Sequence, residues 1–551
     1  MNALKLWLNA TIAGLYGALV LGLFLRATNA DFARGGGLAL VVIIAVYALA
    51  SGVAWALVYG ALRFFASHPL RLSWLNLRYL MAFHVVNSAL LIGACWTTVS
   101  RQRPVLEPGI ADSLEFAYAA MTLTWLFALI VSAIPRLRRS MRVQGVAAAA
   151  AVIALLPPVW LVSVVPAGSA GGVPSMREIA PEGHLVLLNF DGADLEDLLT
   201  LESRGIMPAF SRLRETGSFG RLKSLKPCLT PVTRTTLITG KLPYRHGVRD
   251  AFERRILGGS TRFVVTPAGI GFDWLLAPFQ TLRALSSADR RSLALWEIAS
   301  RMGGAGLASG WDIDLDVPAL SGTHRFDRLG GITGLADLID VENVRRDDPE
   351  DLERIGVLSR ALRADERVSG MLAEAGTEFG PGIVAISFPG LDRVAHTFLR
   401  YARPADFGNV SDPEIDRYGQ VMEGYYRRID TIVERVLAGM DENATLFVTS
   451  SHGIEPQSLR HRFLGEVCGG ERLSGTHVGA PGGFLFARGP QIRHGHSFGS
   501  GSIADVVPTA LYALGMPVAR DLDGKIQTGI FTPQHTGLHA VPIIDSYESG
   551  R

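Results

Sequence analysis

Five long apolar segments occupy the first 166 residues, and they constrain what this chain can fold into more than any other feature of its sequence. Each is close to the roughly 20 apolar residues that an α-helix needs to cross a hydrocarbon core about 30 Å thick. Five such segments in succession exceed what one soluble core could bury. They therefore predict a transmembrane bundle of five helices over residues 1–166. The segments span about residues 6–25, 38–60, 79–99, 116–134 and 143–165.

The overall composition agrees with a chain that lies partly in a membrane. Hydrophobic residues make up 48% of the chain and charged residues 19%, against roughly 25% charged residues in an average soluble domain. The high apolar content excludes a disordered chain. A formal net charge of +2 offers no basic excess for nucleic acid, so no nucleic-acid partner is expected. Three cysteines without zinc-finger spacing exclude a disulfide framework.

Arginines in the short loops predict the orientation of the bundle. The loops after the second and fourth segments carry seven arginines, whereas the loops on the other side carry four, and Lys5 lies at the N-terminus. Because cytoplasmic loops are enriched in Lys and Arg, the N-terminus is expected in the cytoplasm. Five crossings then place the rest of the chain on the outer, periplasmic or extracellular, side. Within the third segment, His84 and Asn87 are expected to form hydrogen bonds between helices.

The character of the sequence changes after the last apolar segment. Residues 167–181 begin with a small, flexible stretch and are interpreted as a linker. Residues 182–551 alternate short apolar segments with amphipathic helical patterns, which predicts an α/β domain with a central, mostly parallel sheet. The expected strands are residues 184–190, 382–388, 444–450 and 483–487.

Polar residues that can bind a metal lie next to each of these four expected strands. Asp191 follows the first, Asp392 and His396 follow the second, and His452 follows the third. His477 precedes the fourth. In open α/β sheets, ligands bind beyond the carboxyl ends of the strands, so these side chains are expected at one edge. Such oxygen and nitrogen donors suit zinc, with manganese possible.

Thr230 is a candidate nucleophile between the first two strands. With Pro231 following, it is typical of a helix N-cap with proline at the first helical position. A hydroxyl at a helix N-terminus that faces a metal could attack a phosphorus centre. The alternative is that Thr230 only caps the helix.

Several motifs, in their order and spacing, resemble the alkaline phosphatase superfamily and most closely its type I phosphodiesterase/nucleotide pyrophosphatase branch. The resemblance extends from about residue 184 to 531, with a divergent middle from about 252 to 377. It rests on LNFDGAD at 188–194, LTPVTRTTLITGKLPYRHGV at 229–248, LDRVAHT at 391–397, TSSHG at 449–453, GTHVGAPGGFLFARGP at 475–490 and DVVPTALYALGMPV at 505–518.

This resemblance implies a site with two divalent metal ions. One would be held by Asp392, His396 and His477, and the other by Asp191, Ser451 and His452. Thr230 would attack the phosphate, and Thr233 and Arg234 would bind the substrate. For Arg234 the alternative is a solvated helix residue. Sulfatases of the same superfamily need a Cys or Ser at the nucleophile position, which Thr230 excludes.

One ligand position departs from the family pattern. The branch has Asp where this chain has Ser451, and a serine hydroxyl is a much poorer ligand than a carboxylate. Three alternatives follow: Ser451 binds weakly, a nearby carboxylate such as Asp194 or Glu455 replaces it, or the centre holds one metal or none.

The membrane half narrows the expected function. Five helices followed by an outer domain of this superfamily resemble phosphoethanolamine transferases and lipoteichoic acid synthases. The prediction is therefore a membrane-bound, metal-dependent phosphodiesterase or phosphotransferase that acts on a phospholipid or a lipid-linked glycan of the cell envelope. Whether water or an alcohol enters second stays open. The alternative is a weakened pseudoenzyme or an envelope-assembly scaffold that binds a phosphorylated ligand.

Overall fold

The computed structural model describes two compact units, each treated by itself below. One unit contains residues 1–170 together with 252–284, and the other contains residues 171–251 and 285–551. The described residues are 2–29, 36–65, 77–134, 179–266, 272–311, 335–339, 348–375, 381–408, 410–457, 473–477 and 479–548, with a few positions between 140 and 149.

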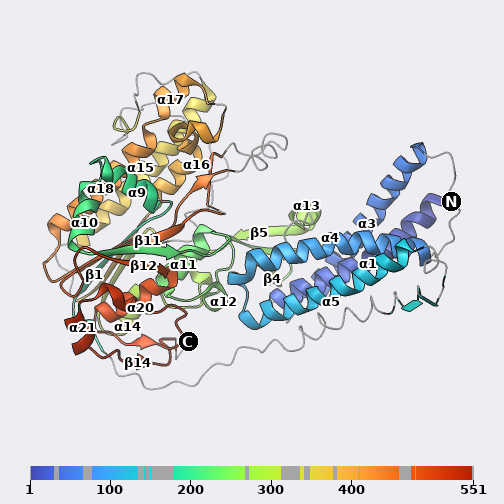
Figure 1. Cartoon of the computed structure of the whole chain (residues 1–551), viewed down its shortest axis with the longest axis horizontal. Coiled ribbons are helices and arrows are strands. Elements are labelled where there is room, and N and C mark those ends of the chain that lie inside the picture. The colour runs from blue at the N-terminus through green and yellow to red at the C-terminus, as the bar shows by residue number, and fades with distance from the viewer. Residues whose placement is uncertain are drawn as a thin grey trace. The chain divides into compact units, whose positions relative to one another are not determined.

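The first unit is built on helices that match the first four apolar segments (Figure 1). Within the described residues, three stretches are long and apolar enough to cross a membrane, at Leu4–Thr28, Gly37–Val58 and Pro108–Val131. The fifth apolar segment lies almost wholly outside the described residues, so a count of five helices stays a prediction. The helices are α1 (Asn2–Thr28), α3 (Gly37–Phe65), α4 (Leu77–Gln102) and α5 (Pro108–Ala133).

Asn87 on α4 makes the contacts between helices that its place in an apolar segment predicts. Its Nδ2 donates to Ser51 Oγ at 3.0 Å, and its Oδ1 accepts from Trp55 Nε1 at 3.2 Å. Both partners lie on α3. Asn87 therefore joins two helices, and its polar atoms are satisfied inside the bundle.

The segment 252–284 lies within the range of the α/β domain in sequence but folds with the helices. It forms a small antiparallel sheet in the order β4-β3-β5 and a short helix. Nothing in its sequence pattern assigned it to the membrane unit. Its elements are β3 (Phe252–Ile256), β4 (Arg262–Phe263), α13 (Phe272–Leu276), η2 (Ala277–Phe279) and β5 (Gln280–Ala284).

The second unit is organised around a sheet of seven strands in the order β12-β2-β11-β8-β1-β7-β6. Register pairing shows that β11 alone among these seven runs opposite to its neighbours. The sheet is therefore mostly parallel, as predicted. Its strands are β1 (His184–Phe190), β2 (Ser218–Lys223), β6 (Ala305–Ser309), β7 (Gly382–Phe388), β8 (Thr445–His452), β11 (Gly482–Arg488) and β12 (His496–Ser502).

Helices cover both faces of this sheet (Figure 1). Successive strand residues point to opposite faces, so Leu188 and Phe190 pack against one helical layer, whereas Leu185 and Leu187 pack against the other. The first layer contains α9 (Leu195–Ser203), α10 (Pro208–Thr216), α15 (Pro349–Ala375), α16 (Gly390–Ala402), α17 (Asp412–Tyr418) and α18 (Val421–Gly439). The second contains α11 (Thr230–Thr239), α14 (Leu295–Arg301) and α20 (Val506–Ala513).

Shorter elements complete this unit. They are α12 (Pro243–His246), α21 (Pro533–Leu538), β9 (Glu455–Pro456), β10 (Gly475–Thr476), β13 (Val518–Ala519), β14 (Ile543–Ile544) and the 3-10 turns η3 (Ser287–Asp289), η7 (Pro404–Asp406), η8 (Ile503–Asp505) and η9 (Thr528–Ile530).

Candidate active site

The sheet brings the predicted site residues to one edge. Asp191 follows β1, His452 ends β8, and Asp392 lies in the first turn of α16, directly after β7. His477 reaches the same edge for a different reason. It precedes β11, which is antiparallel, and Gly482 at the start of β11 pairs with His452 at the end of β8. The amino end of β11 therefore lies beside the carboxyl end of β8.

Asp392, His396 and His477 form one tight cluster. Their possible ligand atoms all lie within 4.8 Å of one another. Asp392 and His396 are one helical turn apart on α16, which places both on the same face. His396 Nε2 lies 3.7 Å, and His477 Nδ1 3.9 Å, from Asp392 Oδ1. One carboxylate and two imidazoles at this spacing are a donor set for zinc or manganese.

The unsatisfied atoms of this cluster fit a metal ion. Asp392 Oδ1 and His477 Nδ1 are buried and have no hydrogen-bond partner among the described residues. Buried polar atoms are rarely left without a partner, so this pair calls for a ligand. His396 Nδ1 donates to Gly475 O at 2.8 Å, which leaves its Nε2 lone pair toward Asp392. Backbone support of this kind is typical of metal-binding histidines.

The charges of the cluster favour the metal-binding protonation states. Burial lowers the pKa of His477 to about 4, so this side chain is neutral near pH 7 and one ring nitrogen keeps its lone pair. Burial acts to raise the pKa of Asp392, but the neighbouring His396 and His477 outweigh it, and the pKa lies below its ordinary value. Asp392 is therefore an anionic ligand.

Thr230 is the first residue of α11. The N-cap is Leu229 rather than Thr230, so the predicted cap is wrong by one residue, and no side-chain cap bond forms. Instead, Thr230 Oγ1 lies 3.3 Å from His452 Nε2. The His452 ring in turn lies 5.1 Å from the His477 ring, centroid to centroid. The Thr230 hydroxyl is thus linked through His452 to the Asp392, His396 and His477 cluster.

The predicted second ligand set is arranged differently. The Asp191 side chain is fully buried, and each of its oxygens has two partners. Oδ1 accepts from Asn189 Nδ2 at 2.8 Å and from Ser451 Oγ at 3.2 Å. Oδ2 accepts from Ser387 Oγ at 3.5 Å and lies 3.1 Å from Arg234 Nε. Three hydrogen bonds and one ion pair within the protein therefore already engage both oxygens of this carboxylate.

Arg234 is the cation of this second set. It is only 3% exposed, which contradicts the alternative of a solvated helix residue. Its guanidinium also donates to Gly310 O and, at 3.3 Å, to Ser387 Oγ. A buried charge needs a partner of opposite sign, and here Asp191 and Arg234 supply each other.

Two carboxylates, Asp194 and Glu455, were candidates to replace a ligand at Ser451. Asp194 caps α9 by accepting from Glu196 N at 2.7 Å, and burial raises the pKa of its carboxyl group. Glu455 lies on β9, outside the described metal cluster.

The two other polar residues near Thr230 are not exposed for chemistry. Thr233 is fully buried and bonds to the carbonyl groups of Leu229 and Thr230. Its role as a substrate-binding residue stays a prediction. Cys228 is buried, and burial raises the pKa of its thiol to about 12, so it is no thiolate nucleophile.

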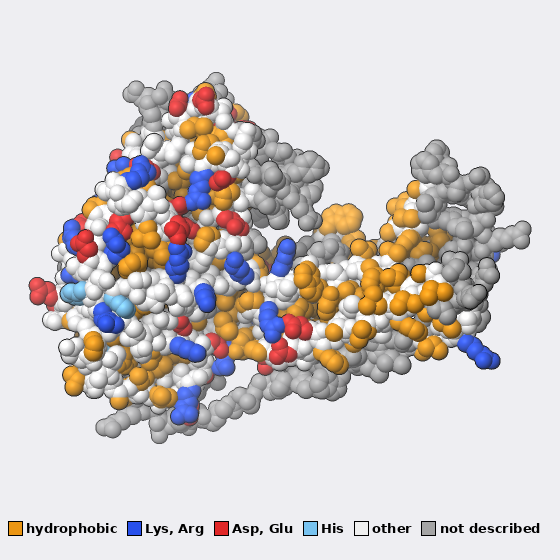
Figure 2. Space-filling model, in the orientation of Figure 1, with side chains coloured by type: hydrophobic (Ala, Val, Ile, Leu, Met, Phe, Trp, Pro, Cys, Tyr) orange, Lys and Arg blue, Asp and Glu red, His pale blue; other side chains and the backbone are white. Residues whose placement is uncertain are grey.

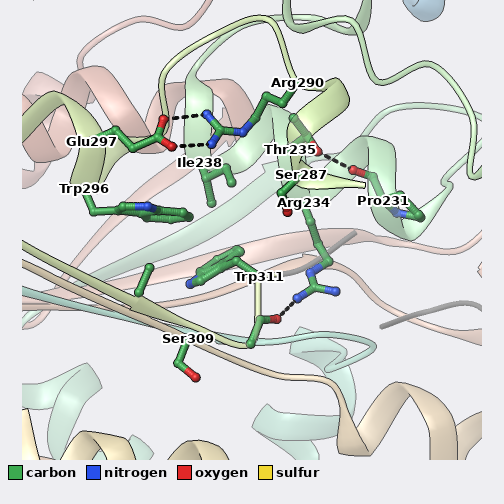
Figure 3. Close-up of a pocket in the computed structure, with 12 residues that line it drawn as sticks. Pro231, Arg234, Thr235, Ile238, Ser287, Arg290, Trp296, Glu297, Ser309 and Trp311 are labelled. Atoms are coloured by element: carbon green, nitrogen blue, oxygen red, sulfur yellow. Dashed lines mark hydrogen bonds and ion pairs between the residues drawn. The ribbon is translucent and has the colours of Figure 1, made fainter. Parts of the chain in front are cut away.

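Arg234 also lines a pocket of about 200 Å³ (Figure 3). Trp296 and Trp311 line it, with their ring centroids 5.8 Å apart. Arg290 and Glu297 also line it and form an ion pair at 2.7 Å. Arg234 lies over Trp311, 5.7 Å from the ring centroid. This arginine therefore contacts both Asp191 and an aromatic pocket.

Sequence reasoning missed Asn189 and Ser387, which hold Asp191. Both lie inside apolar strands, at paired positions of β1 and β7. Asn189 also donates to Ser387 Oγ at 2.9 Å. A polar residue in the last positions of a strand that is buried on both faces is the signal that could have found them, because such a residue must have a buried partner.

Comparisons with known proteins show which family the chain resembles. Residues 185–471, more than half of the chain, match the family model described as type I phosphodiesterase / nucleotide pyrophosphatase. Among solved structures, murine ectonucleotide pyrophosphatase/phosphodiesterase 5 is 13% identical, with a TM-score of 0.40, over 63% of this chain and 99% of its own. A mutant of alkaline phosphatase PafA is also 13% identical, with a TM-score of 0.40, over 66% of this chain and all of its own. A comparison with curated protein sequences gave no match. The chain belongs to the type I phosphodiesterase/nucleotide pyrophosphatase family of the alkaline phosphatase superfamily.

Proposed function

We propose that this chain is a membrane-bound, metal-dependent phosphodiesterase or phosphotransferase whose nucleophile is Thr230. One observation carries the proposal: a Thr230 hydroxyl that caps no helix lies 3.3 Å from His452 and beside the Asp392, His396 and His477 cluster. A nucleophile with a base within hydrogen-bond reach, near a set of candidate metal ligands, is the arrangement that covalent catalysis needs.

His452 is the group that takes the proton of Thr230. Its Nδ1 lies 3.0 Å from Gly453 O, and a carbonyl can only accept, so Nδ1 carries the ring proton. Nε2 is then the acceptor for the Thr230 hydroxyl. As the bond from Thr230 Oγ1 to phosphorus forms, the bond from phosphorus to the leaving oxygen breaks. The proton passes through His452 Nε2 to that oxygen.

The second half of the reaction repeats these steps in reverse. Water, or an acceptor alcohol, attacks the phosphorylated Thr230 and gives its proton to His452. The Thr230 oxygen leaves phosphorus and recovers a proton. Hydrolase and transferase therefore share one set of residues and differ in the second nucleophile.

We infer one bound metal ion rather than two. A divalent ion held by Asp392, His396 and His477 would act as a Lewis acid on the phosphoryl oxygens. The residues of the second set do not favour another ion, because protein groups already engage both Asp191 oxygens, Arg234 supplies the opposite charge, and Ser451 brings none. Arg234 supplies positive charge there instead, as a fixed guanidinium beside the nucleophile's helix turn.

The substrate class follows from the membrane helices of the same chain. One helix would suffice as an anchor, yet the described residues contain three candidate spans. We propose a substrate with a phosphodiester bond at the membrane surface, a phospholipid or a lipid-linked glycan. The catalytic unit would face the periplasmic or extracellular side.

The test combines metal analysis with turnover of an aryl phosphodiester by the purified full-length chain. Thr230→Ala should lower turnover by a factor on the order of 10³ or more and leave the metal content unchanged. Thr239→Ala is the matched control, since that hydroxyl, on the same helix, bonds only main-chain groups. Near-normal turnover by Thr230→Ala would refute the nucleophile. A wild-type chain that binds metal without turnover would favour the alternative, a protein that only binds a phosphorylated ligand.

A further inference from the structure

The segment 252–284 is anchored at one end of the helix bundle by apolar contacts. Four of its side chains, Ile256, Phe263, Val265 and Leu276, are at most 4% exposed and share one core cluster with side chains of the helices. Helix residues of this cluster include Leu25, Ile43, Ile92, Val105 and Ala111. The contacts include the carboxyl-terminal half of α1 and the start of α5, so the segment packs where these helices meet.

Buried hydrogen bonds fix the same place. Asn29, directly after α1, accepts from Val264 N and Val265 N at 2.9 and 3.0 Å and donates to Val265 O at 2.9 Å. Gln102, the last residue of α4, donates to Thr266 O at 3.2 Å. A side-chain amide that pairs with three main-chain groups holds the segment in a single register at the helix ends.

The opposite side of the segment exposes large apolar side chains. Trp274 is 80% exposed although Leu276, two residues later on α13, is fully buried. Leu257, Phe279 and Leu282 are 56%, 39% and 57% exposed. Leu257 has φ of 50°, a conformation that bulky residues rarely adopt, and it is held there with its side chain outward. Four such groups in a segment of 33 residues are more than scattered surface apolarity.

The net charge of the segment, like its exposed apolar side chains, is typical of a membrane interface. It contains four arginines against Glu253 and Asp273. Glu253 is 2% exposed, and hydrogen bonds from Arg283 and Arg255 hold the pKa of its carboxyl group below the ordinary value. The segment is therefore net positive. Tryptophan with arginine is the composition of a surface at the boundary between water and lipid.

The helices next to the segment also expose large apolar side chains. Hydrophobic side chains are exposed along the bundle (Figure 2). Leu38 near the start of α3, Trp96 near the end of α4 and Phe116 near the start of α5 are 69%, 57% and 68% exposed. These positions belong to the end of each helix that lies toward the segment. Helix α13 itself contacts α3 (Figure 1). Lipid that surrounds the helices would thus reach the segment too.

We propose that the segment 252–284 is a membrane-interface element, whose Leu257, Trp274, Phe279 and Leu282 lie at the headgroup–acyl boundary of the bilayer that the helices cross. The occupant of this surface is lipid, and the element docks through apolar area with support from its arginines. The inference is independent of the proposed chemistry, because it rests on the membrane unit alone.

The test measures quenching of Trp274 emission in bilayers. The full-length chain is placed in nanodiscs of phosphatidylcholine that carries bromine either near the headgroup end of the acyl chain or deep in it. Because the chain has nine tryptophans, the emission of Trp274 is taken as the difference between wild type and Trp274→Phe. Trp274 is so exposed that this change leaves folding unaffected. Trp296→Phe, in the catalytic unit, is the matched control.

The expected result is quenching of the Trp274 emission to less than half by shallow bromine, weaker quenching by deep bromine, and no quenching of the Trp296 emission. Trp274 emission that is unchanged by either lipid, as expected for a side chain in water or against a protein partner, would overturn the proposal. Stronger quenching by deep bromine would also overturn it, because the side chain would then lie in the hydrocarbon core rather than at the boundary.

Discussion

The two predicted ligand sets lie at the same edge of the same sheet, yet the structure prepares them in opposite ways. Asp392 and His477 point buried atoms at one another without partners. Both oxygens of Asp191 accept hydrogen bonds from the protein, and Arg234 forms an ion pair with this carboxylate. The difference teaches that ligand-type residues at the right positions do not by themselves make a metal site. What decides is whether the protein has already satisfied them.

Serine in place of the family's aspartate at position 451 explains why the second set needs no metal ion to balance its charge. A carboxylate there would place two anions beside His452 and would call for a divalent ion. Serine removes one of these charges and donates its hydroxyl to Asp191. A single arginine then balances the single remaining carboxylate.

The largest expected effect tests the first set. Asp392→Asn keeps the shape of the side chain but removes the only anionic ligand of the cluster. We expect the bound metal to fall to near zero and turnover to fall by a factor on the order of 10³ or more. Metal analysis and aryl phosphodiester turnover measure both. Asp194→Asn, which weakens a helix cap, is the control and should keep the metal. Full metal content in Asp392→Asn would remove the basis of the comparison.

The second prediction concerns the cation of the other set. Arg234→Met leaves the buried Asp191 carboxylate without a counter-charge, which costs about 3–5 kcal/mol of stability. We expect a clear fall in the melting temperature of the full-length chain, with the metal on the first set retained. Turnover should fall by about 10²-fold, as for other lost electrostatic contacts. A variant with unchanged stability would show that Arg234 does not balance Asp191.

The third prediction converts one set into the other. Ser451→Asp adds a second carboxylate beside Asp191, and Arg234 cannot balance both. We expect metal content to rise from one to two ions per chain when metal is in excess. Ser451→Ala, which adds no charge, should stay at one. Two ions already bound to the wild-type chain would contradict the one-metal proposal while leaving the phosphodiesterase proposal intact.

The smallest effect is expected from pH, through the helix that carries Thr230 and Arg234. His246 is fully buried and bonded to Thr236 on α11, and burial lowers its pKa to about 3. The unfolded chain takes up a proton near pH 6.5 that the folded chain refuses. Stability is therefore lost as pH falls below 6.5, by about 2 kcal/mol at pH 5. Melting temperatures between pH 5 and 7 should show a shallower slope for His246→Asn than for the wild type. Equal slopes would exclude this residue as the cause.

The positions of the site residues were predictable from the sequence, but their state was not. Apolar runs located β1, β7, β8 and β11, and residues next to them proved to be neighbours. An apolar run does not indicate whether a strand is parallel or antiparallel to its neighbours. The sequence therefore did not predict that β11 is antiparallel and that His477 lies at its amino end. Position alone also hid the burial of Arg234, because an arginine in a helix is usually solvated. Its partner Asp191 lies 43 positions earlier in the chain, and only the fold brings the two together.

Gly192 has a consequence that concerns space rather than chemistry. It follows Asp191 with φ of 77°, and a Cβ at this position would lie 2.8 Å from Asp392 Cα and 3.0 Å from Asp392 Oδ1. The main chain at Gly192 therefore packs against Asp392 so closely that only the hydrogen atom of a glycine fits between them. Any side chain here would push the metal-binding carboxylate of Asp392 out of place without altering a single ligand. In the Asp-Gly pair after β1, Asp191 therefore contributes a charge, and Gly192 contributes the space that Asp392 occupies. A substitution at Gly192 could disturb the proposed metal site while every candidate ligand is retained.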